Sequence, residues 1–235
     1  MQINGANVLV TGANRGLGRQ FARSLVERGA AKVYATARRP ELVDVPGVIP
    51  VRLDITDTTS VAAAAVAAPD VDILVNNAGI STGANLISGD LATIRREMDT
   101  HFYGTLNVIR AFAPQLAGGA ILNVLSAISW LAFDGAGAYH AAKAAEWALT
   151  NSARLELAAQ RTLVTGLHLG AADTDMMAWY SGDKAAPEVV VAAALDGIEA
   201  DRTEVLADSW SRQVKAWLAE DPAVIYREAA AALTA

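Results

Sequence analysis

The chain has 235 residues, with 19 Lys and Arg against 25 Asp and Glu and no cysteine. This length is typical of one or two domains, and a net charge of −6 argues against unspecific binding to nucleic acid or to an anionic membrane. Hydrophobic residues make up 53 % of the sequence, yet the apolar runs are far shorter than the roughly 20 residues of a membrane-spanning helix. The missing cysteines exclude disulfide and thiolate chemistry. No leader-like segment opens the chain, so we expect a cytoplasmic protein.

Short apolar runs alternate with longer alanine-rich stretches, which is typical of repeated strand–helix–strand units in a mostly parallel α/β sheet. The apolar runs predict seven strands, at residues 7–10, 32–36, 48–53, 71–75, 120–125, 163–168 and 203–206. The stretches between them predict helices at residues 16–28, 58–68, 91–116, 138–159 and 187–200. A helical tail is expected at 208–235. Because no linker or repeat interrupts the chain, we expect one domain over residues 1–235.

A glycine-rich turn lies between the first predicted strand and the first predicted helix. It reads Thr11-Gly12-Ala13-Asn14-Arg15-Gly16-Leu17-Gly18. Amides at a helix N-terminus attract phosphate, and glycines let the backbone approach a pyrophosphate closely. The spacing is not G-x-G-x-x-G, and no Gly-Lys-Ser/Thr ending is present, which argues against a Walker-type loop. By itself the turn favours a nucleotide site over a purely structural turn.

Four motifs in the expected order together resemble the short-chain dehydrogenase/reductase family. The matching residues are Thr11, Gly12, Gly16 and Gly18 (TGxxxGxG), Asn76, Asn77, Ala78 and Gly79 (NNAG), Ser126, and Tyr139 with Lys143 (YxxxK). The resemblance covers about residues 8–174. It implies a Rossmann-type doubly wound sheet with strand order 3-2-1-4-5-6-7. It also implies a homodimer or homotetramer built through the two long central helices.

Three of these residues are candidate catalytic groups. Hydride transfer to a carbonyl leaves an alkoxide that needs a proton, and we expect Tyr139 to supply it. Lys143 lies one helical turn further on, so we expect its ammonium to bring the pKa of the Tyr139 phenol towards neutrality. In the family this lysine also holds the nicotinamide ribose. Ser126, at the carboxyl end of a strand, is expected to polarise the substrate oxygen.

The expected cofactor site combines the glycine turn with the family resemblance. An acidic residue about 20 positions after the turn would bind an NAD ribose, whereas arginine accommodates the 2′-phosphate of NADP. Arg38 stands there, and with Arg15 it favours NADP(H) over NAD(H). Asp54 is expected at the adenine, with a local cap near Thr56 as the alternative. The predicted cofactor-binding residues are Gly12, Asn14, Arg15, Gly16, Leu17, Gly18, Arg38, Asp54, Ile55, Asn76, Ala78, Gly79, Tyr139, Lys143, Gly170 and Thr174.

Two positions depart from the family pattern. His101 stands where the family commonly has an asparagine that holds a water on the proton path to the lysine. We expect His101 to keep this relay and to give it a different pH dependence, the alternative being a helix histidine satisfied by the backbone. Leu169 replaces the proline that usually precedes Gly170.

The three histidines show no metal-ligand spacing, so we expect no metal.

A substrate lid is expected within residues 171–200, where apolar side chains include Met176 and Trp179. No cluster of Arg or Lys marks a charged substrate. We therefore expect an NADPH-dependent carbonyl reductase, reversible as an alcohol dehydrogenase, that acts on an uncharged and fairly hydrophobic ketone. Two alternatives stay open. One is an NADP(H)-binding sensor or interaction protein with little turnover, which only His101 favours, and the other is a dehydrogenase of sugars or polyols.

Overall fold

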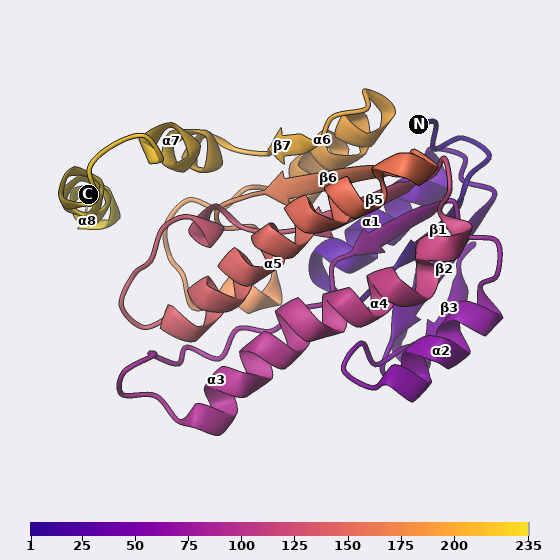
Figure 1. The fold of residues 1–235 in the computed structure, drawn as a ribbon, viewed down its shortest axis with the longest axis horizontal. Coiled ribbons are helices and arrows are strands. Elements are labelled where there is room, and N and C mark those ends of the chain that lie inside the picture. Colours follow the sequence, from indigo (N-terminus) through magenta and orange to yellow (C-terminus); the bar gives the residue numbers. More distant parts are fainter. Residues whose placement is uncertain (235) are drawn as a thin grey trace.

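A computed structural model, which describes residues 1–234, shows one parallel sheet between two layers of helices (Figure 1). Its strands are β1 (Asn7–Val10), β2 (Lys32–Ala37), β3 (Ile49–Arg52), β4 (Ile73–Asn76), β5 (Ala120–Val124), β6 (Leu163–His168) and β7 (Glu204–Leu206). They lie in the order β3-β2-β1-β4-β5-β6-β7, and each neighbouring pair is parallel. The expected fold class and strand order are confirmed.

Eight α-helices are described. They are α1 (Gly16–Glu27), α2 (Thr58–Ala67), α3 (Leu91–Met98), α4 (Thr105–Phe112), α5 (Gly137–Glu156), α6 (Pro187–Glu199), α7 (Ser209–Trp217) and α8 (Pro222–Thr234). The tail is helical as expected, apart from residue 235, which lies outside the described residues. In Figure 1, α7 and α8 extend beyond β7 at the end of the molecule away from the N-terminus.

The prediction of one uninterrupted α-helix at residues 91–116 is wrong in the middle of that range. A π-helical turn, η2 (Asp99–Gly104), separates α3 from α4, and it buries His101. A π turn inserts one extra residue into the helical ladder and is frequent at functional sites. Because one inserted residue hardly disturbs the apolar pattern, hydrophobic periodicity does not reveal it.

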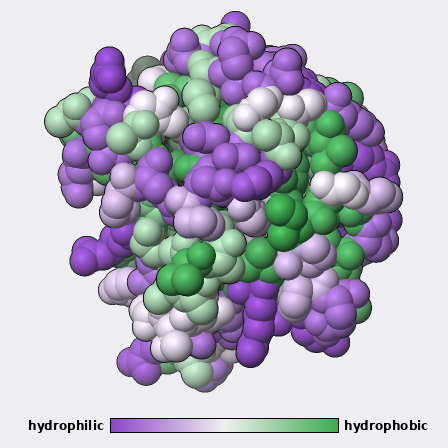
Figure 2. Space-filling model, turned by 90° about the vertical axis from the view of Figure 1, so that its right-hand side faces the viewer, coloured by the Kyte–Doolittle hydropathy of each residue, from purple (hydrophilic) through white to green (hydrophobic). Residues whose placement is uncertain are grey.

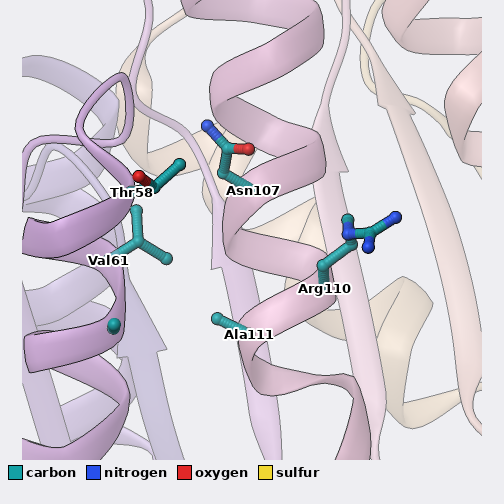
Figure 3. A pocket seen from close by; sticks show the side chains of 6 residues that line it. Thr58, Val61, Asn107, Arg110 and Ala111 are labelled. Atoms are coloured by element: carbon teal, nitrogen blue, oxygen red, sulfur yellow. The ribbon is translucent and has the colours of Figure 1, made fainter.

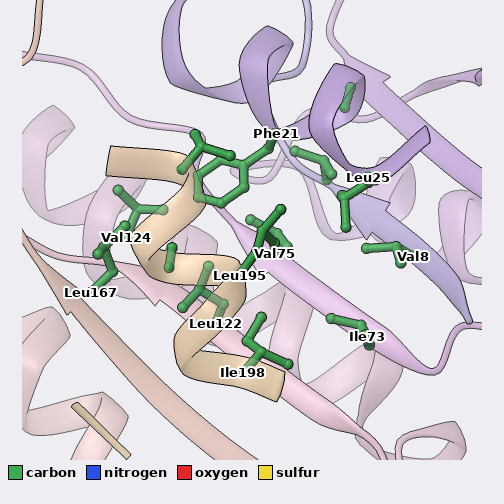
Figure 4. Packing of buried hydrophobic residues seen from close by; sticks show 14 of the residues in the cluster. Val8, Phe21, Leu25, Ile73, Val75, Leu122, Val124, Leu167, Leu195 and Ile198 are labelled. Carbon is green, nitrogen blue, oxygen red and sulfur yellow. The ribbon is translucent and has the colours of Figure 1, made fainter. Parts of the chain in front are cut away.

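The core is divided between the two faces of the sheet, because successive side chains of a strand point in opposite directions. Val8 and Ile73 pack with Phe21 of α1 on one face (Figure 4). Leu9 and Leu74, the next residues along these strands, pack with residues of α2, α4 and α5 on the other face. Strands buried on both sides explain the continuous apolar runs in the sequence.

Helix α6 belongs to this core, although the expected lid range 171–200 includes it. The side chains that α6 buries are Val190, Val191, Ala194, Leu195 and Ile198. A helix held by so many apolar side chains does not move freely over a site. The lid stays a prediction, and it concerns the loop at 171–186.

The surface has mixed polarity. Figure 2 shows hydrophobic side chains interspersed with hydrophilic ones over the face it presents. Within residues 1–234, no helix has both the length and the apolar character needed to cross a membrane.

Candidate active site

The glycine turn forms a cradle at the start of α1. Gly12 and Gly16 have φ values of 66° and 53°, in the left-handed region that favours glycine. A Cβ added to Gly18 would lie 2.1 Å from the Gly12 carbonyl oxygen. The side chain of Arg15, the N-cap residue of α1, makes no hydrogen bond to the helix amides, and the first turn of α1 contains no acidic residue. These open amides at a positive helix end fit the phosphates of a dinucleotide.

Asn77 and Thr11 fix this turn to the end of β4. Thr11 Oγ1 accepts hydrogen bonds from the backbone amides of Asn77 and Ala78, both at 2.9 Å. Asn77 Nδ2 donates to the carbonyl oxygens of Thr11 (2.9 Å) and Gly12 (3.3 Å). Asn77 is not among the cofactor residues predicted from the sequence, and the asparagine pair was the signal that pointed to it. Its role is to hold the cradle in shape.

Arg15 and Arg38 lie at the same edge of the sheet. Arg38 directly follows β2, and the turn that carries Arg15 is tied to β2 by the Ala13 amide, which donates to the Thr36 carbonyl (2.8 Å). Both arginines are exposed. Neither guanidinium makes an ion pair within the described part of the chain. The two charges are therefore open to a ligand.

The expected adenosine-side residues have local partners. Asp54 Oδ1 accepts from the amide (3.0 Å) and the hydroxyl (2.7 Å) of Thr56, so the local turn weighed as an alternative is present. Asn76 Nδ2 donates to Asn123 Oδ1 (2.8 Å), while Asn76 Oδ1 is buried with no partner among the described residues. Ile55 packs against Gly104. Cofactor contacts of these side chains stay predictions.

Gly170 and Thr174, which follow β6, are placed differently. A Cβ added to Gly16 would lie 3.5 Å from Thr174 Cγ2, so Thr174 lies beside the glycine turn. The Gly170 amide donates to Asp208 Oδ2 (2.6 Å), at the N-cap of α7. This amide is thus engaged within the protein, and Asp208 is a residue that no motif indicated.

Lys143 joins α5 to the strand that leads to Ser126. Lys143 Nζ donates to the carbonyl of Val124 (2.8 Å), the last residue of β5. Ser126 follows two residues later, where its Oγ donates to the Leu169 carbonyl and accepts from the Ile128 amide, both at 3.3 Å. The structure therefore brings Lys143 to the strand end that carries Ser126.

Tyr139 is mostly buried, with its ring centroid 5.9 Å from Lys143 Nζ. Burial raises the pKa of the Tyr139 phenol, and the Lys143 ammonium lowers it. The carboxylates of Glu146 and Glu97 add to the rise, so the net direction is upward. The expected fall of this pKa towards neutrality is wrong for the protein by itself, because burial and two carboxylates outweigh one ammonium. A phenol that stays protonated is the form that donates a proton.

His101 lies between two buried carboxylates. Its Nε2 is 2.8 Å from the Ile80 carbonyl oxygen and 3.3 Å from Glu97 Oε2. Its Nδ1 is 3.8 Å from Glu146 Oε2, and its ring meets the Tyr139 ring edge-on at 5.1 Å. The backbone contact weighed as an alternative is present, together with a direct approach to the catalytic helix.

Glu97 and Glu146 are not among the residues predicted from the sequence. Glu97 stands four residues before His101, and Glu146 stands three residues after Lys143. Such spacings place each pair on one helical face, which was the available signal. Side chains of both glutamates are at most 2 % exposed.

His168 supports Ser126 from β6. Its Nδ1 lies 3.0 Å from the Ser126 carbonyl oxygen, and its ring stacks on Trp130 at 3.8 Å. Burial lowers the pKa of His168 to about 4. The ring is therefore neutral at neutral pH and donates through Nδ1–H to this carbonyl.

Comparison with known proteins decides the family. A family model described as short chain dehydrogenase matches residues 6–185. The chain belongs to this family. As a short-chain dehydrogenase it is an NAD(P)-dependent oxidoreductase that acts on small molecules.

Relatives and solved structures agree with this assignment. The short-chain dehydrogenase is 35 % identical over 178 residues to an NADPH-dependent 1-acyldihydroxyacetone phosphate reductase of Schizosaccharomyces pombe, covering 71 % of this chain and 60 % of that protein. It is 31 % identical to carbonyl reductase [NADPH] 2 of Sus scrofa, covering 72 % of each. A short chain dehydrogenase from Burkholderia cenocepacia J2315, solved in complex with NADP, has 39 % identity and a TM-score of 0.93, with 97 % and 98 % of the two chains covered.

The loop at 171–186 of this short-chain dehydrogenase is held at its base. Lys184 forms an ion pair with Asp173 (2.9 Å), which ties the two ends of the loop together. The middle of the loop carries Trp179, whose side chain is 75 % exposed, and Met176, which is 38 % exposed. Exposed apolar side chains on a loop tied at its base fit the expected lid.

A separate groove of about 260 Å³ lies between α2 and α4 (Figure 3). It is lined by Thr58, Val61, Ala62, Asn107, Arg110 and Ala111. None of these residues belongs to the site that the motifs of the short-chain dehydrogenase predict. The groove therefore lies outside the site that the motifs predict.

Proposed function

We propose that this short-chain dehydrogenase reduces an uncharged, fairly hydrophobic ketone with NADPH and oxidises the corresponding secondary alcohol in the reverse direction. The observation that carries the proposal is that Lys143 is bonded to the end of β5, which places the tyrosine helix against the strand that leads to Ser126. When bound, the nicotinamide cofactor supplies or accepts the hydride.

The chain's own residues move the proton. Tyr139 donates its hydroxyl proton to the substrate oxygen as that oxygen gains negative charge. The Ser126 hydroxyl gives a hydrogen bond to the same oxygen, in place of its long bond to the Leu169 carbonyl. The Lys143 ammonium stabilises the phenolate that remains. In the oxidative direction each of these transfers runs backwards.

Two features support NADP(H) as the cofactor. Arg15 and Arg38 are exposed beside the glycine cradle, and a guanidinium binds a phosphate well. The two relatives named above are described as NADPH-dependent reductases, and the Burkholderia structure contains NADP. We infer a preference for NADP(H) over NAD(H) from the two arginines.

Features of the predicted lid support the proposed substrate class. Lys184, the only Lys or Arg in the loop at 171–186, is paired with Asp173. No cation of this loop is thus left over for a carboxylate or phosphate of the substrate. The exposed side chains of Met176 and Trp179 offer apolar contact instead. These features support a neutral, apolar substrate.

The oligomeric state stays a prediction. Tyr103 of η2 and Leu155 of α5 are 53 % and 79 % exposed, on the helical layer where the family resemblance places subunit contacts. A partner subunit would remove such side chains from water.

The proposal is tested with the purified protein, NADPH or NADH, and a panel of aromatic ketones, cyclic ketones and sugars. We expect NADPH oxidation, followed by its absorbance, to be at least about tenfold faster with the apolar ketones than with the sugars. Faster turnover of sugars would contradict the substrate class. Cofactor binding without turnover of any compound would favour a sensor.

We infer that His101 belongs to the proton path. His101→Asn removes an ionisable ring from between Glu97 and Glu146. Because His101 stands on the proposed proton path, we expect His101→Asn to change the pH profile of ketone reduction. The matched control is His140→Asn, because burial lowers the pKa of His140 to about 4 and its ring stays neutral in the assay. A His101→Asn profile that superimposes on the wild-type profile would exclude the relay.

A further inference from the structure

The carboxylate of Glu146 lies inside the active site of the dehydrogenase, although no motif includes it. Its Oε2 accepts a hydrogen bond from Lys143 Nζ at 2.6 Å, and its Oε1 accepts from Thr105 Oγ1 at 3.1 Å. The Lys143 and Glu146 side chains are only 6 % and 2 % exposed. A buried ion pair of this kind has a large effect when one partner is removed.

The contacts of Lys143 leave it little freedom. An ammonium has three N–H donors. One points to the Val124 carbonyl (2.8 Å) and one to Glu146. One donor is therefore left for the cofactor ribose or the Tyr139 oxygen, and the two acceptors of the protein fix the position of the nitrogen.

Glu146 also affects the charge of Lys143. Burial lowers the pKa of the Lys143 ammonium, but the charge and hydrogen bond of Glu146, together with the charges of the Tyr139 phenolate and of Glu97, outweigh burial. This pKa therefore ends above its ordinary value, and Glu146 makes the largest of the contributions that raise it. The ammonium would otherwise be an unpaired cation in a buried place, which is unfavourable. His101 Nδ1, at 3.8 Å from Glu146, is too distant for a hydrogen bond.

We propose that Glu146 is a positioning residue for the carbonyl chemistry, which holds the Lys143 ammonium in place and in its charged form one helical turn from Tyr139. The inference rests on the proposed function. The titratable groups that face Glu146 are Tyr139 and Lys143 of α5, His101 of η2 and, beyond the histidine ring, Glu97 of α3.

The proposal has a definite consequence for the pH profile. Without the carboxylate, the buried ammonium loses its proton at a lower pH. Ketone reduction needs both the Tyr139 phenol and the Lys143 ammonium in their protonated forms. The alkaline limb of the reduction profile therefore moves to lower pH when Glu146 is neutralised.

The direct measurement is the titration of the lysines by carbon-13 NMR at Cε. The chain has four lysines, and Lys32, Lys184 and Lys215 form ion pairs at the surface. The Lys143 signal is identified by its loss in Lys143→Arg. In Glu146→Gln, which keeps the volume and removes the charge, we expect Lys143 to titrate about one pH unit or more below wild type.

Two further variants separate positioning from general stability. Glu146→Asp keeps the charge. In this variant we expect Lys143 to titrate at a pH between that of Glu146→Gln and that of the wild type. Glu199→Gln makes the same chemical change in a remote ion pair, that of Glu199 with Arg28 (2.9 Å), and is expected to leave the Lys143 titration unchanged. The alkaline limb of kcat/KM for reduction should follow the NMR shift in each variant.

An unchanged Lys143 titration in Glu146→Gln would overturn the proposal, and so would a lower Tm with an unmoved alkaline limb. If Glu146→Gln does not fold, Glu146→Asp decides, because withdrawing the carboxylate by one methylene should still displace both readouts in the same direction. The NMR titration needs no turnover. A dehydrogenase that reduced none of the ketones would contradict the proposed function. The lysine titration would still show whether Glu146 holds Lys143 in its charged form.

Discussion

Tyr139→Phe is expected to lower kcat for NADPH-dependent ketone reduction by roughly 10³-fold, because general acid catalysis contributes 10²- to 10⁴-fold in enzymes. The variant loses only the hydroxyl that protonates the substrate oxygen. Its ring still packs edge-on against His101, so the fold and the binding of NADPH are expected to persist. Turnover is followed by NADPH absorbance, and NADPH binding by calorimetry.

Tyr103→Phe is the matched control for this result. Tyr103 is 53 % exposed on η2, and its hydroxyl has no hydrogen-bond partner among the described side chains. We expect its kcat to stay within about twofold of wild type, because the change removes one hydroxyl and keeps the aromatic ring, including any contact of that ring with a partner subunit. If Tyr139→Phe kept more than a tenth of the wild-type kcat, another group would have to be the acid. His101, whose ring lies 5.1 Å away, would then be the first candidate.

The strands and the glycine turn could be predicted because they depend on local patterns, whereas the order of the strands was implied by the family resemblance. A strand buried on both faces is a continuous apolar run, as at Val8 and Leu9. The turn needs glycine at positions 12 and 16, where φ is positive. It also needs glycine at position 18, where an added Cβ would collide with the Gly12 carbonyl oxygen. Such requirements restrict the residue type at a single position, so one sequence is enough to show them.

The partners of the catalytic residues could not be predicted in the same way. Glu146 and Lys143 share a helical face, but an i,i+3 pair of opposite charges is usually an exposed pair of little consequence. Only the packing of η2 and α3 against α5 shows that the pair is buried. The same packing brings His101 next to Glu146 and Glu97 next to His101. The direction of the Tyr139 pKa depends on this burial. An argument from Lys143 alone therefore reached the opposite sign.

The cofactor preference is expected to depend on Arg38. Arg38→Asp removes a cation that would pair with the 2′-phosphate and places there a carboxylate, which repels phosphate and accepts hydrogen bonds from a ribose. A hydrogen bond to a charged group contributes about 1.5–3 kcal/mol, so we expect the NADPH to NADH ratio of kcat/KM to fall by roughly 10²-fold. The ratio is measured with one ketone at a fixed, low salt concentration, since exposed charges are screened by salt.

Arg39→Asp supplies the control, because it makes the same change in charge at the next residue. Arg39 is exposed and is the N-cap residue of the short turn Pro40–Leu42, without a side-chain cap. If Arg38 contacts the 2′-phosphate directly, Arg39→Asp should change the NADPH to NADH ratio of kcat/KM by less than about threefold. Equal effects of the two variants would show that the preference arises from the general positive charge at this edge of the sheet. Arg15→Ala would then have to lower the ratio as strongly as Arg38→Ala, since the three guanidinium groups would act through their summed field.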